Sequence, residues 1–444
     1  MVFTTRRRMA WVPLDAMTVT IAELAGHRGE TVTVAGWVVH HRSSGQIEFI
    51  VLRDGSGELQ AVSRGETRTR LESRLAELTQ ETAVRVGGTV RPDPRSPGGI
   101  ELEIDDVQIV GRSEGFPIGP KEHGIDFLMD HRHLWLRSRR QVALIKLRAA
   151  IIRSLRNFLD NNGFIVADPP VITPSAAEGS TTLFAIDYFD EPAYLSQSGQ
   201  LYLEALAMAL GRVYAFGPTF RAEKSKTRRH LTEFWMVEPE MAFCEFEENL
   251  VWQERLVEAV VQEVLRECPE ELAVLERDLT RLRSVRAPFP RITYEEALAL
   301  LEPRGLGVQW GEDLGAPHET ALAEAFDRPV FLTHFPIELK AFYMQPDASN
   351  PRLALAADLL APEGYGEIIG GSQRIHDLAL LERRMADHGL DPERYRWYVD
   401  LRRYGSVPHS GFGVGLERLV AWIGGVEHVR ETVPFPRTLT RLWP

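Results

Sequence analysis

The sequence of 444 residues is poor in cysteine and contains no long apolar run. Two cysteines, Cys244 and Cys268, are too few for a disulfide framework or a four-cysteine zinc site, and they indicate a reducing compartment. No run approaches the roughly 20 apolar residues that a membrane-spanning helix needs. Near the N-terminus, Pro13 and Asp15 interrupt the chain before the apolar core of a signal peptide could form. We therefore predict a soluble, cytoplasmic protein.

Residues 1–17 are predicted to be an extension that precedes the first domain. Their start is basic, from Arg6 to Arg8, so a transit peptide is one alternative. A start codon assigned too early, with Met17 as the true initiator, is the other.

Positive charge is also in deficit, because the net charge is −12. This balance argues against a protein that coats nucleic acid without specificity. Local basic clusters at His40–Arg42 and Arg137–Arg140 leave a specific nucleic-acid partner open. The length and the 44% of apolar residues allow two or three domains with buried cores.

Residues 18–112 are rich in short apolar strands separated by turn residues. The expected strands are residues 32–42, 47–54, 59–63, 82–92 and 100–110. A helical stretch, Arg68 to Leu78, precedes the fourth strand. This pattern predicts an OB-fold barrel, which commonly binds single-stranded nucleic acid, although a purely structural barrel fits equally well.

Residues 113–135 contain proline and glycine and are predicted to be a hinge before a larger domain, residues 136–444. Residues 131–164 predict one long amphipathic helix, and residues 248–282 predict a charged helical region. His131 and His133 suggest a metal pair, but no third ligand follows in register. Residues 286–326 form a partly helical insertion whose role the sequence does not reveal.

Residues 213–243 contain an apolar strand, a basic loop and a second apolar strand. Strand alternation predicts that Arg221 and Glu223 leave the first strand on the same side. The loop also carries Lys224, Lys226, Arg228, Arg229 and His230. These cations are enough to bind a triphosphate, and Phe234 offers an aromatic face for a base. The alternative is a hairpin with a solvated basic tip.

These residues resemble a known family. Residues 220–223, FRAE, followed by residues 228–234, RRHLTEF, resemble motif 2 of the class II aminoacyl-tRNA synthetases, in the subgroup for aspartate, asparagine and lysine. Residues 411–418, GFGVGLER, resemble motif 3, and the helix with Pro170 resembles motif 1. The resemblance covers nearly the whole chain. It implies an α+β protein: an OB-fold anticodon-binding domain, then a catalytic domain with an antiparallel sheet flanked by helices.

The resemblance implies ATP and Mg²⁺ as cofactors, a homodimer formed through motif 1, and tRNA bound at its anticodon loop and acceptor end. It assigns ATP to Arg221, Glu223, Arg229, His230, Leu231, Phe234, Glu367, Gly415 and Arg418. Arg221 and Arg418 are the expected catalytic residues. Asp358 and Glu367 are the expected Mg²⁺ ligands, because acids within apolar strands are costly unless paired; the alternative is an ordinary pair of surface acids.

The amino-acid pocket follows from the same resemblance. It is assigned to Glu178, Ser198, Gln200, Arg221, Glu238, Ser372 and Arg374. Glu178 lies in a segment that resembles a mobile loop. The sequence EIIGGSQR is expected to place Glu367 and Arg374 on either side of a glycine turn.

Two departures bear on which amino acid is used. Leu203 stands where aspartyl enzymes carry a lysine, and Glu238 stands where they carry an aspartate. Both changes favour a carboxamide over a carboxylate, so the expected activity is asparagine–tRNA ligation. The alternatives are an aspartate–tRNA ligase, which need not discriminate, a lysyl enzyme, a non-catalytic tRNA-binding relative, and a tRNA-independent asparagine synthetase.

The barrel resembles the anticodon-binding domain of the same enzymes. Phe49 matches an aromatic residue that stacks on an anticodon base, and Gln60 matches an amide that reads the middle uridine. Arg42 and Glu103 are expected as neighbouring contacts. For Phe49 the alternative is a core aromatic residue in a half-buried strand.

Overall fold

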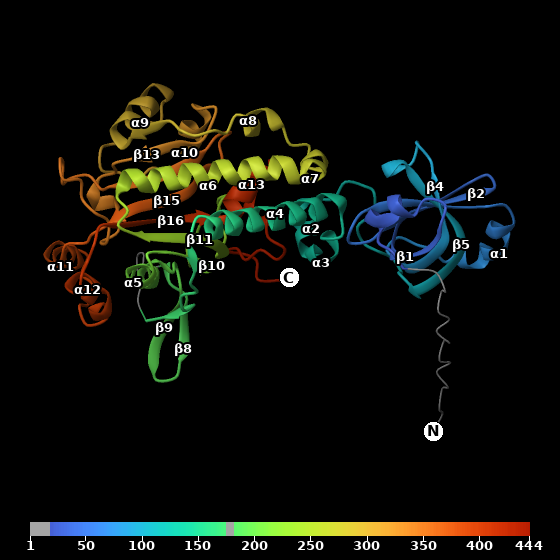
Figure 1. Ribbon diagram of the computed structural model, residues 1–444, viewed down its shortest axis with the longest axis horizontal. Helices are drawn as coiled ribbons and strands as arrows, with labels where there is room; N and C mark the ends of the chain where they lie inside the picture. Colours follow the sequence, from blue (N-terminus) through green and yellow to red (C-terminus); the bar gives the residue numbers. More distant parts are fainter. Residues whose placement is uncertain (1–17, 175–181) are drawn as a thin grey trace. The chain divides into compact units, whose positions relative to one another are not determined.

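The computed structural model describes residues 18–174 and 182–444. The chain divides into two compact units between His123 and Gly124 (Figure 1). This boundary falls inside the segment expected to be a hinge. Each unit has a hydrophobic core of its own.

The first unit is a closed five-stranded barrel with the strand order β1-β2-β3-β5-β4. Its elements are η1 (Ile21–His27), β1 (Thr31–Ser44), β2 (Ile47–Arg53), β3 (Glu58–Arg64), α1 (Gly65–Leu75), β4 (Ala83–Pro92), η2 (Pro97–Gly99) and β5 (Ile100–Gly111). Burial alternates along β2, where Ile50 and Leu52 point into the core. The predicted OB-fold is confirmed.

The second unit is built on an eight-stranded, mainly antiparallel sheet with the order β12-β13-β14-β15-β16-β11-β10-β6. These strands are β6 (Ile165–Val166), β10 (Arg212–Phe220), β11 (Glu233–Ala242), β12 (Arg291–Thr293), β13 (Val330–Thr333), β14 (Ala356–Ala361), β15 (Gly366–Arg374) and β16 (His409–Gly415). A separate small sheet contains β7 (Ile172–Thr173), β8 (Ala185–Tyr188) and β9 (Glu191–Leu195). The α+β class is therefore confirmed.

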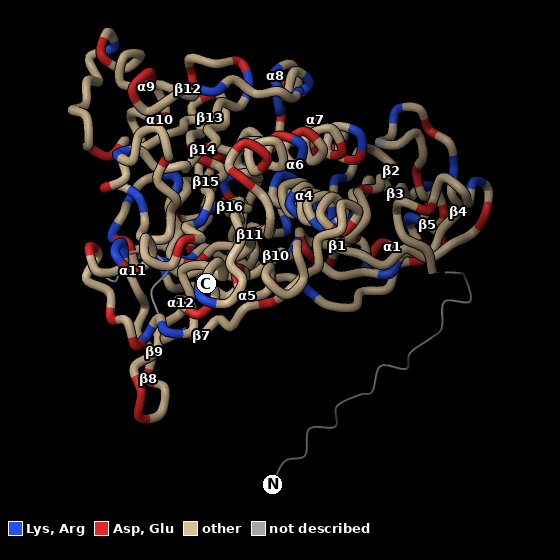
Figure 2. Tube along the Cα trace, turned by 60° about the vertical axis from the view of Figure 1, so that its left-hand side comes forward, with Lys and Arg blue, Asp and Glu red and all other residues tan. Residues whose placement is uncertain are grey.

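Helices α4 (Arg139–Asn161), α6 (Phe246–Glu267) and α13 (Leu416–Gly424) pack on the sheet and share its largest core (Figure 1). The other helices are α2 (Ile125–Asp130), α3 (Arg132–Trp135), α5 (Gln200–Leu210), α7 (Pro269–Val274), α8 (Leu279–Arg283), α9 (Tyr294–Leu301), η4 (Glu302–Arg304), α10 (Ala316–Glu324), η5 (Ile337–Leu339), α11 (Leu378–Asp387), α12 (Arg396–Arg403) and η6 (Val429–Glu431). Acidic and basic residues are interspersed along this unit (Figure 2). None of the helices in residues 18–174 and 182–444 is long and apolar enough to cross a bilayer.

Three expectations about elements are corrected. The long helix begins at Arg139, because the Ser138 side chain accepts a hydrogen bond from the Gln141 N–H and caps a new helix. The second helical region breaks at Pro269, which starts α7. The sequence EIIGGSQR is not a turn: residues 366–374 form one strand, paired with β14 and β16.

Candidate active site

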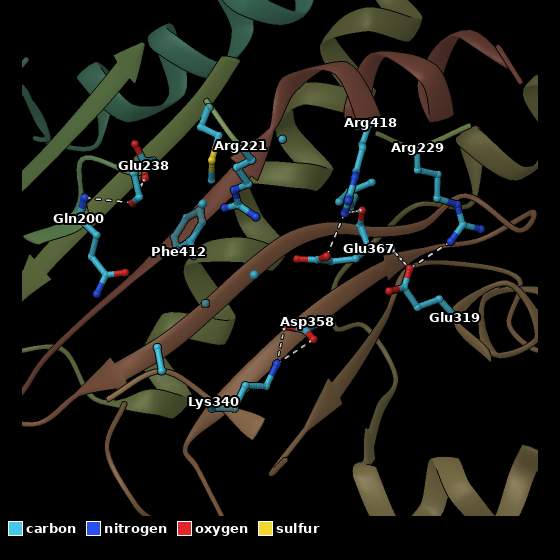
Figure 3. Close-up of a pocket in the computed structure, with 18 of the residues that line it drawn as sticks. Gln200, Arg221, Arg229, Glu238, Glu319, Lys340, Asp358, Glu367, Phe412 and Arg418 are labelled. Carbon is cyan, nitrogen blue, oxygen red and sulfur yellow. Dashed lines mark hydrogen bonds and ion pairs between the residues drawn. The ribbon is translucent and has the colours of Figure 1, made fainter. Parts of the chain in front are cut away.

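A cavity of about 700 Å³ opens among β11, β14, β15, β16 and α10 (Figure 3). It gathers most of the residues that the sequence assigned to ATP, metal and amino acid. These are Ser198, Gln200, Arg221, Glu223, Arg229, His230, Leu231, Phe234, Glu238, Asp358, Glu367, Arg374, Gly415 and Arg418. Ser372 is fully buried outside the lining. Glu178 lies outside the described residues.

Arg221 and Arg418 are two cations that line this cavity (Figure 3). Strand β10 ends at Phe220, so Arg221 and Glu223 lie just beyond it, but both line the cavity. The Arg221 N–H donates to the Thr232 carbonyl at 3.0 Å, which holds the two ends of the basic loop together. The Arg418 Nη1 donates to the Glu367 Oε2 at 2.8 Å. The Arg418 guanidinium can therefore meet an anion from a fixed position, and the Arg221 backbone is held at the cavity.

Phe234 presents its ring to the cavity next to Arg221, whose Cζ lies 5.5 Å from the ring centroid. The Glu223 Oε2 lies 3.1 Å from the His230 Nε2. Hydrogen bonding from His230 lowers the pKa of Glu223 and keeps the carboxylate ionised. This corner combines an aromatic face with a carboxylate acceptor, which suits a flat heterocycle that carries an amino group.

Arg229 differs from the exposed cations of the loop because its guanidinium is buried against α10. Its Nη1 donates to the Glu319 Oε2 at 3.0 Å, and its Nη2 donates to the Thr320 Oγ1 at 2.5 Å and to the Gly364 carbonyl. Gly366 has a φ of +73°, and a Cβ there would lie 2.4 Å from this guanidinium, so a larger residue would strain the backbone and displace the Arg229 side chain. The Arg229 side chain therefore ties the basic loop to α10 and to the start of β15.

Asp358 and Glu367 lie on β14 and β15 on the same side of the cavity. A Cβ on Gly370 would lie 3.0 Å from the Glu367 Oε1 and 3.7 Å from the Asp358 Oδ1, so both carboxylates converge over this glycine. Burial raises the pKa of Asp358 to about 7, and Lys340, at 3.1 Å, partly offsets that rise. Burial opposes ionisation of Glu367, but Arg418 and Lys340 lower its pKa overall. Two converging carboxylates fit the preference of Mg²⁺ for oxygen ligands.

Glu319 and Lys340 are among the charged residues of the cavity that the sequence did not identify (Figure 3). Glu319 comes from α10, inside the insertion of residues 286–326, and its Oε2 accepts from the Glu367 N–H at 3.2 Å. Burial and the neighbouring Glu367 raise the pKa of Glu319. A lone acid in a short helix carries no local pattern that marks it as a site residue, so its role is visible only in three dimensions.

At the other end of the cavity, Glu238 is held by its neighbours on the chain segment before α5. The Gly199 N–H donates to the Glu238 Oε2 at 3.0 Å, and the Ser198 Oγ donates to the Glu238 Oε1. A Cβ on Gly199 would lie 2.4 Å from the Pro169 Cγ, so a larger residue does not fit. Glu238 therefore keeps one orientation at the cavity wall.

Arg374 forms a buried bidentate ion pair with Glu240. The Arg374 Nε and Nη2 donate to the Glu240 Oε1 and Oε2 at 3.1 and 2.9 Å. Ser372 accepts from the Arg374 Nη1 at 2.6 Å, so it supports the arginine without lining the cavity. The guanidinium is thus fixed and electrically matched by the protein.

Behind this pair, Glu204, Glu240 and His409 are spaced closely enough to hold a metal ion. Glu204 already accepts from the Arg402 Nη2 at 2.5 Å, from the Tyr398 hydroxyl at 2.8 Å and contacts the His409 Nε2 at 2.9 Å. It also accepts from the Gln200 Nε2 at 3.1 Å. Arg402 neutralises Glu204, and Arg374 neutralises Glu240. This cluster is therefore a supporting network that fixes Gln200 and Arg374.

In the barrel, three of the four residues expected to bind an anticodon lie in one row. Arg42 pairs with Phe49 across β1 and β2, Phe49 with Val62 across β2 and β3, and Val62 with Glu103 across β3 and β5. The Arg42 Cζ lies 4.4 Å from the Phe49 ring centroid. Gln60 is two residues from Val62 on the same strand, and its Nε2 donates to the Ser96 Oγ at 3.1 Å.

Comparison with known families matches residues 124–439 to the tRNA synthetases class II (D, K and N). Residues 32–110 match the OB-fold nucleic acid binding domain. The chain is 58% identical to the asparagine–tRNA ligase of Roseiflexus sp. (strain RS-1), and the match covers 96% of this chain and 99% of that protein.

Solved structures show the same similarity. The Pyrococcus horikoshii asparaginyl-tRNA synthetase complexed with asparaginyl-adenylate is 44% identical with a TM-score of 0.93, over 96% of this chain and 99% of that one. The Entamoeba histolytica asparaginyl-tRNA synthetase in complex with asparaginyl-adenylate is 34% identical with a TM-score of 0.89, and the match covers 97% of this chain and 99% of that one.

Proposed function

Because the chain belongs to the class II tRNA synthetases (D, K and N), we propose that it activates L-asparagine with ATP and transfers it to the 3′ end of tRNA(Asn). In the first step the α-carboxylate of asparagine attacks the α-phosphorus of ATP, and pyrophosphate leaves. In the second step a hydroxyl of the terminal ribose attacks the acyl carbon, and AMP leaves. No nucleophile from the protein is needed, so the protein positions the substrates and neutralises charge.

The resemblance to this family suggests a role for each residue, and their shared place in the cavity supports these roles. Arg221 would bridge the amino-acid carboxylate and the α-phosphate, and Arg418 with His230 would hold the γ-phosphate. Phe234 would stack on adenine, with Glu223 accepting from its amino group. Mg²⁺ on Asp358 and Glu367 would neutralise charge on the β- and γ-phosphates when bound.

The charge arrangement around Arg374 is the observation that carries the choice of asparagine. Glu240 already matches Arg374, and Glu238 adds a second carboxylate at the cavity wall. Leu203 supplies no compensating cation there. A substrate carboxylate would therefore meet excess negative charge, whereas the NH₂ of a carboxamide can donate to Glu238.

A homodimer is part of the proposal. Apolar side chains are exposed along the β6 edge of the large sheet and just after it: Ile165 and Val166 are each 47% exposed, and Val171 and Ile172 are 39% and 43% exposed. An exposed apolar sheet edge is a ready surface for another chain.

A cytoplasmic location is also proposed, supported by two buried cysteines that remain free thiols.

ATP–pyrophosphate exchange with purified protein tests the proposal directly. Exchange with asparagine is expected to exceed exchange with aspartate at least about a hundredfold, a gap of about 2.7 kcal/mol. A preference for aspartate would contradict the argument from Glu238 and Leu203 but leave the ligase mechanism in place. No exchange with either amino acid would indicate a non-catalytic relative.

A further inference from the structure

The C-terminal residues 435–444 expose an unusual amount of apolar surface. Trp443 is 80% exposed, Leu442 is 73% exposed and Leu439 is 41% exposed. Large apolar side chains gathered in one short segment at the surface indicate a contact with something outside the chain. The question is what covers them.

This exposed segment is anchored, not loose. The Arg132 Nε donates to the Pro434 carbonyl at 2.9 Å just before it, and the Arg441 Nη2 lies 2.8 Å from the Asp130 Oδ1. Thr438 and Arg441 exchange backbone hydrogen bonds of 3.2 and 3.3 Å across a tight turn. The Arg437 Nη1 donates to the Pro444 carbonyl at 3.2 Å, so the end of the chain folds back and holds Trp443 in place.

The anchor lies at the base of the basic loop of the active site. The Thr232 N–H donates to the Arg437 carbonyl at 2.9 Å, and the backbones of Glu233 and Arg437 pair in an isolated antiparallel β-bridge. Thr232 in turn accepts from the Arg221 N–H at 3.0 Å, and Arg221 lines the cavity. Trp443 is therefore connected through Arg437 and Thr232 to the loop beside the reacting groups.

The neighbouring charge favours a polyanion. Lys224, Lys226 and Arg228 are exposed on the loop, and Arg437 and Arg441 belong to the C-terminal segment. Glu233, Asp130 and Glu427 reduce this positive charge but do not remove it. In a chain with a net charge of −12, two arginines in the same short segment as an exposed tryptophan are a specific local feature. The Arg441 Nη1 donates to the Trp443 carbonyl at 3.1 Å. RNA-binding surfaces commonly combine cations, which contact the phosphates, with an aromatic ring, which stacks on a base.

We propose that Trp443, together with the basic loop, is a docking surface for the acceptor end of tRNA, where the indole stacks on an end base and the loop cations contact phosphates. The inference rests on the proposed function, because only a ligase needs the 3′ end of an RNA at this cavity. It deepens that function by adding a C-terminal aromatic contact. A second copy of this chain is the competing occupant, since exposed leucines also suit a protein contact.

Two measurements on Trp443→Ala in the full chain test the proposal. Asparagine-dependent ATP–pyrophosphate exchange needs no RNA and is expected to stay within twofold of the unaltered protein, which also shows that the variant folds. The KM for tRNA in aminoacylation is expected to rise at least about fivefold, equivalent to about 1 kcal/mol. Trp443→Phe, which keeps a ring, should recover most of the loss. Tyr404→Ala, at another 75% exposed aromatic residue, is the matched control and should change neither value.

An unchanged KM for tRNA in Trp443→Ala would overturn the inference. A change in the sedimentation of Trp443→Ala, from dimer to monomer, would also overturn it and assign the surface to a second copy. Failure of the proposed function looks different, because the unaltered protein would then show no asparagine-dependent exchange at all.

Discussion

The ion pair of Arg374 and Glu240 sets the charge at the end of the cavity where we propose that the amino acid binds. Both side chains are almost fully buried, with side-chain exposures of 4% and 1%. A buried pair of this kind is costly to break, because one charge is left without a partner in a medium of low polarity. The pair holds Arg374 in place, and Glu240 neutralises the positive charge that Arg374 would otherwise present to a substrate.

Glu240→Gln is predicted to weaken discrimination between asparagine and aspartate. Arg374 then has an unmatched charge, so exchange with aspartate relative to asparagine should rise about tenfold or more. The free energy of unfolding should fall by about 3–5 kcal/mol. ATP–pyrophosphate exchange and denaturant unfolding measure the two effects. Glu254→Gln, which removes a buried acid paired with Arg291 outside the cavity, should lower stability without changing the amino-acid ratio; an unchanged ratio in Glu240→Gln would contradict the charge argument.

His428 makes stability depend on pH. Burial, reinforced by Arg430, lowers its pKa to about 4, and its Nδ1 accepts from the Arg430 N–H at 3.2 Å. A lowered histidine pKa means that the fold favours the neutral ring. The resulting stability is fully present above the unfolded pKa of about 6.5 and is lost as the pH falls toward 4.

His428→Asn should remove this pH dependence, because the amide oxygen can still accept from Arg430 but does not titrate. The unfolding free energy of the unaltered protein should fall relative to the variant between pH 6.5 and 4.5. The relative fall should be no more than about 1 kcal/mol, since the ring is only half-buried and solvent screens its charge. Urea unfolding at the two pH values measures it. A difference between the two proteins that does not vary with pH would show that His428 does not titrate as argued.

At the scale of elements, α10 connects the insertion to the active site. Glu319 holds the Arg229 guanidinium and the Glu367 N–H at once, so this short helix fixes both the basic loop and the start of β15. The insertion is therefore a wall of the cavity, on the side where we propose that ATP binds, and not a peripheral addition.

Glu319→Ala is predicted to raise the KM for ATP about tenfold and to leave the KM for asparagine nearly unchanged, because only the nucleotide side loses its support. Exchange kinetics with each substrate varied in turn measure this split. Glu319→Gln keeps an acceptor for the Glu367 N–H, so its KM for ATP should lie between those of the unaltered protein and Glu319→Ala. Glu295→Ala, on the exposed side of α9, is the control. An equal rise in both KM values would point to general unfolding of the cavity instead.

At the scale of the whole molecule, the catalytic cavity and the OB-fold barrel belong to units with separate cores. Core residues of the barrel and of the larger unit form distinct clusters. A chain of residues 124–444 is predicted to retain asparagine-dependent ATP–pyrophosphate exchange and to lose tRNA charging. Phe49→Ala in the full chain should act more mildly, raising the KM for tRNA by the loss of one stacking contact, about 1–3 kcal/mol. Loss of exchange in the shortened chain would show that the units depend on each other to fold.

Much of the fold was predictable because its pattern is local. Strand alternation placed the five barrel strands, and the motif residues identified the loop that carries Arg221 and the strand that carries Gly415. The errors also have local causes: the Ser138 cap and Pro269 split helices that apolar periodicity alone makes continuous, and the two glycines of EIIGGSQR suggested a turn where neighbouring strands impose an extended backbone.

The sequence by itself determined the fold class and the family, and it predicted most of the candidate site residues that line the cavity, because periodicity and motifs lie within short stretches of chain. Tertiary structure alone decided the pairing of Arg229 with Glu319, 90 residues away, and of Gly199 with Glu238, 39 residues away. It also joined the segment that carries Trp443 to Thr232, at the base of the basic loop, through Arg437. Such contacts depend on how distant elements pack. A short stretch of sequence therefore does not determine which charged residue pairs with a given buried charge.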